Sequence, residues 1–444
     1  MANTHLTRTI SSGGADLTKW TWSCWVKRTD LVGGGNNYQR LISNEVSGNT
    51  KSWYIRFQNS TQFHAWSNNG AFEFTTNGKY RDINGWYHLV VKYDSTQSTE
   101  ADRFKVYVNG EEPSMSAIHY PTLNETVNFM NTGNYIDIGY YRQGSSEYFH
   151  GLMSHMHFTA GYAYDASAFG STDSTTGEWK INTSPSVTYG SLGFFILKDG
   201  NSLTDQSGEG NNFTVGGGTL TKTEDNPSNV FATWNPLQAT TSASYDFVAG
   251  NTRMAVNDTA VFSLGATLAA TTGKYYMEMK WVQQGGNGSW GMIPIDTDIS
   301  NRPRNAGVGW NQSDNAPWLL GSIVSGSWGG SIGTSDIIQL AMDLDNGAFY
   351  FGKNGTYLNS GNPTSGASKT GAVDFSGTSL FGKQLTFAIG KGASGTDGWN
   401  ANFGNGYFEQ TAVSSAGTNA SGNGIFEYDV PTGYTALSTK GLNL

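Results

Sequence analysis

The stretch that decides the fold is Trp86-Tyr-His-Leu-Val-Val-Lys-Tyr-Asp94, which a polar turn joins to Phe104-Lys-Val-Tyr-Val-Asn-Gly110. The same pattern returns as Ile337-Ile-Gln-Leu-Ala-Met-Asp-Leu-Asp-Asn-Gly347 followed by Ala348-Phe-Tyr-Phe-Gly-Lys-Asn-Gly355. Each copy predicts a β-hairpin followed by a second tight turn, because Asn and Gly tolerate the positive φ that such turns need. Two copies so far apart predict two similar β-sandwich domains in one chain.

The composition agrees with a chain of many short strands. Its 444 residues include 58 glycines, 13% are aromatic and only 14% are charged. This mixture suits strands separated by turns and disfavours a helix-rich or disordered chain. The net charge of −9, without a basic stripe, argues against nucleic acid as a partner. The single cysteine, Cys24, excludes an intrachain disulfide, and its alternation with Trp22 and Val26 predicts a core position.

The strand pattern divides the chain into three parts. We expect a first sandwich over 1–165, a small connecting β subdomain over 166–237 and a second sandwich over 238–444. The expected strands of the first sandwich, besides the hairpin, are 20–27, 52–58, 62–67, 135–141 and 151–159; those of the connecting part are 193–198 and 212–215; those of the second sandwich are 273–282, 337–344, 348–353, 385–389 and 400–403. Helical periodicity is nearly absent, and only Asp165–Phe169 predicts a short helical turn, with Asp165 as its cap.

Export and membrane signals are missing from the sequence. The first nine residues contain no apolar run of the signal-peptide type, and no stretch reaches the ~18 apolar residues of a membrane span. The composition is nevertheless that of an extracellular adhesive protein. A virus particle released by host lysis would resolve this contradiction, because its proteins reach the outside without secretion.

Several motifs carry a family resemblance. Ser23-Cys-Trp-Val-Lys27, the 86–110 hairpin and Phe149-His-Gly-Leu-Met-Ser-His-Met-His157 resemble a laminin-G-like, concanavalin A-type domain. Gly273-Lys-Tyr-Tyr-Met-Glu278, the 336–355 block, Ala401-Asn-Phe-Gly404 and Pro431-Thr-Gly-Tyr-Thr-Ala-Leu437 resemble a SPRY domain. This order is similar to virion-associated proteins of tailed phages, especially those of marine bacteria. The resemblance implies two antiparallel jelly-roll sandwiches, in agreement with the strand pattern.

Catalysis is not expected. Glycosidases of the concanavalin A type present paired carboxylates at alternate positions of one strand, but no Glu-x-Asp-x-x-Glu run occurs here. Asp343 and Asp345 alternate where the second hairpin turns, so we interpret them as turn caps. Among the histidines only His155 and His157, two apart on one strand, have a spacing that a metal site could use. The same face would also carry Met153, so we favour partial burial of these histidines over a metal site.

The first candidate binding site lies on two neighbouring strands. In 52–58, Trp53, Ile55 and Phe57 share one face, so the alternate residues share the other. Sugars bind to flat aromatic faces beside hydrogen-bonding groups. The predicted glycan or partner patch is Tyr54, Arg56, His64 and Trp66, extended by Tyr107. The alternative is an outer face that the connecting subdomain or another subunit covers.

The second candidate site is a set of loops in the Gly-rich stretch between Gln283 and Asp336. SPRY domains bind partners through loops at one end of the sandwich, so the resemblance implies partner binding here. The candidate residues are Trp290, Arg302, Arg304, Trp310, Asn311, Trp318 and Trp328. The alternative for Trp310 is a core strand position. Asp205 and Asn211, with Asn212, form a weak candidate calcium site, for which turn chemistry is the alternative; no other cofactor is expected.

The leading hypothesis is a non-enzymatic phage virion protein that recognises a glycan or receptor of the host surface. It would belong to a tail fibre, a tail tip or a head-attached fibre. The alternative is a capsid or tail decoration protein that only packs against other virion proteins. Either way we expect a homo-oligomer on the particle, other virion proteins as partners, no membrane span, and a location on the virion, outside the cell after host lysis.

Overall fold

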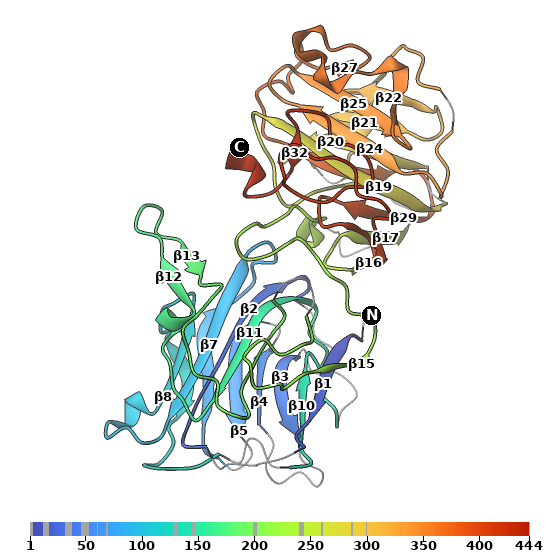
Figure 1. Cartoon of the computed structure of the whole chain (residues 1–444). Coiled ribbons are helices and arrows are strands. Elements are labelled where there is room, and N and C mark those ends of the chain that lie inside the picture. Colours follow the sequence, from blue (N-terminus) through green and yellow to red (C-terminus); the bar gives the residue numbers. More distant parts are fainter. Residues whose placement is uncertain are drawn as a thin grey trace. The chain divides into compact units, whose positions relative to one another are not determined.

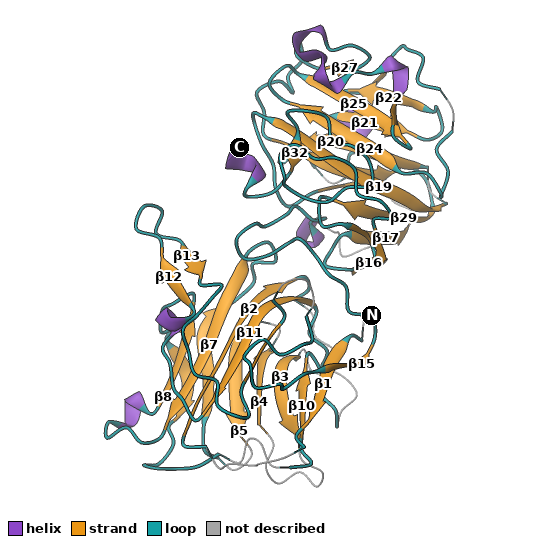
Figure 2. Ribbon diagram, viewed as in Figure 1, coloured by secondary structure: helices purple, strands orange, loops and turns teal. Residues whose placement is uncertain are grey.

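The computed structural model describes residues 3–11, 17–31, 38–45, 53–59, 61–67, 70–127, 132–143, 147–198, 202–238, 244–258, 261–285, 287–298, 300–329 and 331–443. These residues form strands and turns almost throughout (Figure 2). The chain divides into two compact units (Figure 1). Unit 1 comprises Met1–Lys222 and Asn226–Ser228, and unit 2 comprises Thr223–Asp225 and Asn229–Leu444. No helix in the described ranges is long and apolar enough to cross a membrane.

Unit 1 is built from two antiparallel sheets. The larger has the strand order β15-β1-β10-β3-β4-β5-β6-β9, and the smaller has the order β14-β11-β2-β7-β8. The strands are β1 (His5–Thr9), β2 (Lys19–Arg28), β3 (Gln39–Glu45), β4 (Trp53–Gln58), β5 (Gln62–Ser67), β6 (Glu73–Lys79), β7 (Trp86–Asp94), β8 (Phe104–Val108), β9 (Met115–His119), β10 (Tyr135–Ile138), β11 (Gly151–Ala160), β14 (Phe194–Ile196) and β15 (Thr214–Gly217). Two 3-10 turns, η1 (Glu100–Asp102) and η2 (Ala166–Ala168), connect them.

The two sheets of unit 1 enclose one hydrophobic core. Strand β4 sends Trp53, Ile55 and Phe57 into this core, as its alternation predicts. Strand β2 of the opposite sheet contributes Trp20 and Cys24. The expected core position of Cys24 is confirmed, since its side chain is fully buried and burial raises the pKa of the thiol.

The segment after β11 adds strands to both sheets of unit 1. Its first part is a small hairpin of β12 (Gly170–Thr172) and β13 (Trp179–Ile181). Farther along, β14 pairs with β11, and β15 pairs with β1, so each of the two sheets gains an edge strand. The strands expected in the connecting part therefore belong to unit 1, while the limits at 165 and 237 stay predictions.

Unit 2 also contains two large sheets. One has the order β16-β17-β29-β19-β24-β25-β26, with β27 beside β25 and β32 beside β19; the other has the order β18-β28-β20-β21-β22-β23. The strands are β16 (Ser244–Val248), β17 (Arg253–Asp258), β18 (Phe262–Gly265), β19 (Lys274–Gln284), β20 (Gly288–Pro294), β21 (Val308–Asn311), β22 (Ala316–Leu319), β23 (Ser322–Ile323), β24 (Ile338–Asp343), β25 (Ala348–Lys353), β26 (Thr356–Tyr357), β27 (Val373–Asp374), β28 (Leu385–Lys391), β29 (Gly395–Asn402), β30 (Tyr407–Phe408), β31 (Thr411–Ala412) and β32 (Thr435–Ala436). The helical turns are α1 (Pro303–Ala306), η3 (Pro236–Gln238), η4 (Leu358–Ser360), η5 (Pro363–Ser368) and η6 (Gly441–Asn443).

A second core lies between these two sheets. Met277 and Phe349 come from the larger sheet, and Trp290, Trp310 and Phe387 come from the smaller one. Each unit is thus a sandwich of two sheets around its own core, and all strand pairs of these sheets are antiparallel except β19 with β32, which is parallel. The predicted all-β class with two concanavalin A-like sandwiches is confirmed.

The repeated hairpin is confirmed in both units. Strands β7 and β8 pair antiparallel, as do β24 and β25. Asn109 and Asn354, which begin the two closing turns, have φ of 50° each and are followed by Gly110 and Gly355 with φ of 84° and 85°. Positive φ at both positions is the reason that the sequence uses Asn-Gly there.

Candidate functional site

The first candidate patch is assembled on the outer face of the larger sheet of unit 1. Strands β4 and β5 pair so that Tyr54 lies opposite Trp66 and Arg56 lies opposite His64. The ring of Tyr54 lies 5.5 Å from the ring of Trp66 and 5.6 Å from that of His64. Tyr54 and Trp66 are half-buried, whereas Arg56 and His64 are buried. Four of the five predicted patch residues therefore come together.

Two arginines alternate with tyrosines on this face. The Arg40 guanidinium carbon lies 3.6 Å from the ring centre of Tyr54 and 4.4 Å from that of Tyr141. The guanidinium carbon of Arg56 lies 3.7 Å from the ring centre of Tyr38 and 4.5 Å from that of Tyr54. Each guanidinium contacts two rings, which allows a charged group to be buried on an outer sheet face. We call these five residues the tyrosine–arginine stack.

Glu147 supplies the negative charge of the stack. One of its carboxylate oxygens accepts a hydrogen bond from Arg40 Nε at 2.6 Å, and the same oxygen lies 3.8 Å from Arg56 Nη1. Its backbone carbonyl also accepts from the Arg40 amide at 3.0 Å. One carboxylate faces two guanidinium groups, so the stack keeps an excess of positive charge.

Three buried nitrogens of the patch lack a hydrogen-bond partner among the described residues. They are Arg40 Nη1, Arg56 Nε and His64 Nδ1. Burial, together with the charges of Arg56 and Arg40, lowers the pKa of His64 to about 3, so this imidazole is neutral at physiological pH. An unpartnered buried polar group costs free energy and is a position where a ligand group or a water can bind.

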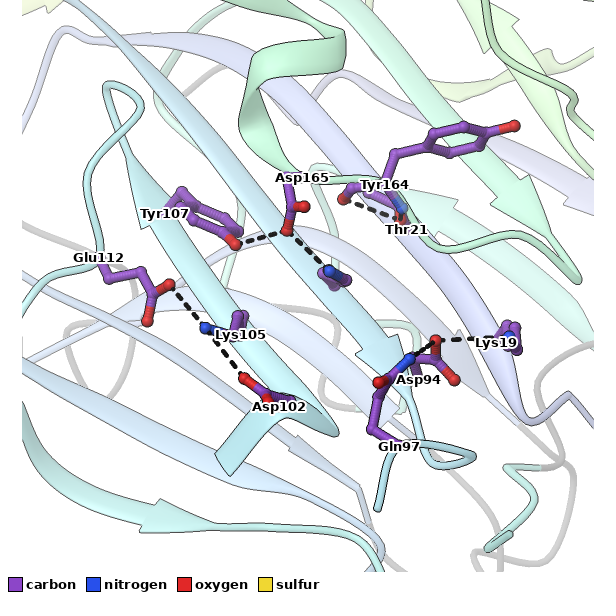
Figure 3. A network of polar contacts seen from close by, with 11 residues as sticks. Lys19, Thr21, Asp94, Gln97, Asp102, Lys105, Tyr107, Glu112, Tyr164 and Asp165 are labelled. Atoms are coloured by element: carbon purple, nitrogen blue, oxygen red, sulfur yellow. Dashed lines mark hydrogen bonds and ion pairs between the residues drawn. The ribbon is translucent and has the colours of Figure 1, made fainter. Parts of the chain in front are cut away.

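Tyr107 does not belong to this patch. It lies on β8, in the smaller sheet, where its hydroxyl donates to Asp165 at 2.6 Å (Figure 3). The same carboxylate oxygen accepts from Lys92 at 2.7 Å. The predicted capping role of Asp165 is also wrong, because its side chain makes no cap hydrogen bond to the helical turn η2 and binds Lys92 and Tyr107 instead.

Three of the predicted loop tryptophans of unit 2 are core residues. Trp290 lies on β20 and Trp310 on β21, both fully buried, and Trp328 is 4% exposed in the same core. The prediction that they line a binding loop is wrong for these three, and the alternative for Trp310, a core strand position, is confirmed. Their tryptophan rings pack between the sheets, where Trp290 and Trp310 stack at 6.3 Å.

Three of the other four loop candidates, Arg304, Asn311 and Trp318, contact one carboxylate. Asp314 Oδ2 accepts from Trp318 Nε1 at 2.9 Å and from the Asn311 amide, and lies 3.7 Å from Arg304 Nη1. The Arg304 guanidinium carbon also lies 4.5 Å from the ring centre of Trp318. Arg302 directly precedes α1 and is 9% exposed. Burial and the positive charge of Arg304 lower its pKa, and the charge of Asp314 acts in the opposite direction.

The candidate calcium ligands are engaged in a turn. Asp205 accepts from the backbone amides of Phe195, Ser207 and Asn211 and from the Ser207 hydroxyl. Asn211 accepts from Arg8 and donates to the carbonyls of Ser191 and Gly193. The described residues contain no group of three or more His, Cys, Asp or Glu side chains placed to hold a metal. Turn chemistry therefore accounts for these side chains.

The interpretation as a cap of the hairpin turn is confirmed for Asp343, whereas the side chain of Asp345 binds a backbone amide outside its own turn. Asp343 accepts from the Asn346 amide at 3.0 Å and pairs with Lys274 at 3.0 Å. Asp345 accepts from the amide of Gly273 at 2.7 Å.

Sequence reasoning missed three of the five residues of the tyrosine–arginine stack, and also Glu147. Tyr38, directly before β3, and Arg40, within it, stand at alternate positions, so a period of two could have placed them on one face. Tyr141 and Glu147 follow β10 in a connection that has no periodic pattern, and only the folded chain brings them over β3 and β4.

Comparison with known proteins gives a family match for the first part of the chain. Residues 6–161 match the family model of the concanavalin A-like lectin/glucanases superfamily, in its laminin G form. A search of curated proteins gives no match.

Solved structures give weak overall likenesses. The SPRY domain of human HERC1 covers 38% of this chain and 96% of its own, at 12% identity and a TM-score of 0.29. Domains LG4-5 of the mouse laminin alpha1 chain cover 90% of this chain and 86% of their own, at 8% identity and a TM-score of 0.29. The heptameric SAP-like pentraxin of Limulus polyphemus covers 35% and 70%, at 15% identity and a TM-score of 0.24. The SPRY-like assignment of 238–444 stays a prediction.

Proposed function

We propose that this chain is a non-enzymatic recognition protein of a phage virion that binds a glycan or receptor on the host surface. The observation that carries the proposal is the outer face of β3, β4 and β5. There a half-buried tryptophan, Trp66, shares one sheet face with Arg40, Arg56 and His64, each of which has one buried nitrogen without a partner in the described structure.

The chemistry of this face suits a saccharide. An indole ring offers a flat apolar surface for the C–H face of a sugar, and the neighbouring nitrogens offer hydrogen bonds to its hydroxyls. The match of 6–161 to a family whose description includes lectins supports a binding role. The virion location rests on the order of the two motif sets in the sequence, and the protein would reach the outside when the host lyses.

Binding at one such face would be weak. A single shallow site of this kind is expected to have a dissociation constant of roughly 0.1–1 mM. Many copies on one particle would convert this weak binding into firm attachment through effective concentration. The proposal therefore includes a homo-oligomer anchored to other virion proteins.

A structural role is the second candidate, and one observation favours it. Arg40 and Arg56 contact Tyr54, and Glu147 pairs with both arginines, so much of the stack is satisfied from within. A decoration protein would use such a stack only to hold Tyr141 and Glu147 against the sheet.

The test compares adsorption of multimerised protein to host cells. Trp66→Ala is expected to reduce adsorption about fivefold, since a sugar–indole contact is worth on the order of 1 kcal/mol. The matched control is Tyr162→Ala, which removes a 44% exposed aromatic ring that follows β11 in the other sheet. Both variants should keep the melting temperature of the wild type.

Two results would reject the recognition role. One is a Trp66→Ala variant that adsorbs as well as Tyr162→Ala and the wild type. The other is wild-type protein that binds no host cell or host glycan at any valency, which would leave the decoration role.

A further inference from the structure

Four arginines of the described residues are buried: Arg28, Arg40, Arg56 and Arg302. Arg302 differs from the other three in its hydrogen bonds. Arg28 donates to the carbonyl of Tyr80, Arg40 to Glu147 and Arg56 to Gln58. Each of these three also has one buried nitrogen without a partner, whereas in Arg302 both Nε and Nη1 are buried without any hydrogen-bond acceptor in the described ranges.

The surroundings of Arg302 do not compensate its charge. Burial and the positive charge of Arg304 both lower the pKa of Arg302, and only Asp314 acts in the opposite direction. That carboxylate is already engaged by Trp318, Asn311 and Arg304. Arg304 Nε is likewise buried without a partner in the described structure. Two guanidinium groups thus share one carboxylate that other donors occupy.

Unpartnered acceptors lie in the turn that carries Asp314. The side-chain oxygens of Asn311, the last residue of β21, and of Gln312 and Asn315, between β21 and β22, are buried and accept no hydrogen bond from the described residues. Strand β21 packs against α1, which begins directly after Arg302. Unpartnered donors and acceptors therefore occur on neighbouring elements of one small region.

Such an arrangement is unfavourable for folding. A buried guanidinium without a carboxylate or carbonyl partner costs more than it contributes, and native structures rarely keep one without a reason. Residues that are poorly compensated in the free protein are typical of sites that a ligand completes.

We infer that Arg302 and Arg304 form a second binding site, in unit 2, for a carboxylate-bearing saccharide. A carboxylate matches the planar fork of a guanidinium group. The hydroxyls of the sugar both donate and accept, so they suit the mixed set of unpartnered nitrogens and oxygens. Trp318, whose ring Arg304 contacts, supplies an aromatic surface beside the charges. The site is independent of the face around Trp66 in unit 1.

The test measures binding of the full-length protein to two matched probes. One is an oligosaccharide of galacturonic acid, and the other is the same oligosaccharide with its carboxylates reduced to alcohols. We expect the acidic probe to bind at least tenfold more tightly, because a hydrogen bond to a charged group is worth about 1.5–3 kcal/mol, or roughly 10- to 100-fold in affinity. The same preference should persist in Trp66→Ala, which separates this site from the first.

Variants at the site give the decisive comparison. Arg302→Gln should weaken binding of the acidic probe about tenfold or more without lowering the melting temperature, since it removes an uncompensated buried charge. Arg253→Gln is the matched control, because Arg253 is paired with Asp246 and Glu409 in the same unit. Gly392→Ala should act like Arg302→Gln, since a Cβ at Gly392 would overlap the Arg302 guanidinium.

Several results would overturn the inference. Equal binding of the two probes, or unchanged binding by Arg302→Gln, would exclude a carboxylate site. A loss of stability in Arg302→Gln but not in Arg253→Gln would show that Arg302 is a structural residue. Tighter binding of an aspartate-rich peptide than of the acidic oligosaccharide would assign the site to a peptide instead.

Discussion

At the scale of single residues, the two hairpins are closed by the same side-chain hydrogen bond. Asn109 accepts from the backbone amide of His88 at 2.8 Å, and Asn354 accepts from that of Ile337 at 2.8 Å. In each unit the asparagine that begins the closing turn thus ties it back to the first strand of the hairpin. The asparagine has two separate tasks: it adopts a positive φ, and it satisfies an amide.

These tasks can be separated by substitution. Asn354→Ala is expected to destabilise unit 2 by about 2 kcal/mol or more, because alanine is strained at positive φ and the Ile337 amide loses its acceptor. Asn354→Gly should cost only about 1 kcal/mol, since glycine tolerates this φ. Denaturant unfolding of both variants measures the difference, and equal losses would contradict the backbone part of the explanation.

Prediction from the sequence worked best for residues within a regular alternation. Tyr54, Arg56, His64 and Trp66 were placed on one face because strands β4 and β5 have a strict period of two. The prediction failed for Trp290 and Trp310, since their glycine-rich surroundings suggested loops. Apolar residues alternate there too: Trp290 and Met292 are two residues apart on one strand, and Val308 and Trp310 are two apart on the next. All four side chains are buried.

At the scale of elements, the β12–β13 hairpin is held on the smaller sheet of unit 1 by one side chain. Trp179 Nε1 donates to Nδ1 of the buried His88 at 3.0 Å, and the two rings stack at 6.0 Å. An indole nitrogen can only donate, so His88 Nδ1 must be unprotonated and Nε2 carries the hydrogen toward Ser23 Oγ, 2.8 Å away. Burial lowers the pKa of His88 to about 3, in agreement with this neutral form.

Trp179→Phe should therefore detach the hairpin in part. The variant keeps an aromatic ring but leaves His88 Nδ1 buried without a donor, which costs about 1–3 kcal/mol. We expect a lower melting temperature of unit 1 and faster proteolysis within 170–181. Lys180→Gln on the same hairpin is the control, because its pair with Asp173 is exposed and contributes little. If both variants behave alike, Trp179 is not the anchor.

The strands themselves were predictable, but their partners were not. The apolar runs 193–198 and 212–215 were expected in a separate connecting part, and the structure adds β14 and β15 to the two sheets of unit 1. Local sequence specifies that a segment is extended, whereas the sheet edge that it joins depends on contacts far away in the chain. The same limit hid Tyr141 and Glu147 from the candidate site.

At the scale of the whole molecule, the two units contain buried titratable groups that change the stability of their units in opposite directions when the pH falls. In unit 1, burial lowers the pKa of His64 and His88 to about 3 and that of His157 well below its usual value. In unit 2, burial raises the pKa of Glu278 to about 7, although the amides of Glu427 and Tyr428 and the Tyr276 hydroxyl donate to it and lower the pKa.

The signs follow from proton binding in the folded and unfolded states. As the pH falls below about 6.5, the histidines of the unfolded chain bind protons, whereas the buried histidines of folded unit 1 stay neutral. The unfolded state is therefore favoured, and unit 1 loses stability. As pH falls from about 7 to 4.5, folded unit 2 holds a proton on Glu278 that its unfolded chain releases, so unit 2 gains stability. Between pH 7.5 and pH 5, His64 and His88 would each cost unit 1 up to about 2 kcal/mol, and Glu278 would stabilise unit 2 by about 2 kcal/mol.

Calorimetry at pH 7.5 and pH 5 tests this opposition. We expect two unfolding transitions, of which the transition of unit 1 moves to lower temperature at pH 5 and that of unit 2 moves to higher temperature. Asn109→Ala and Asn354→Ala assign the transitions, because each destabilises only the unit that contains it. Glu278→Gln should remove most of the shift of unit 2, since glutamine does not titrate. If both transitions move in the same direction by similar amounts, these buried groups do not determine the pH dependence of the two units.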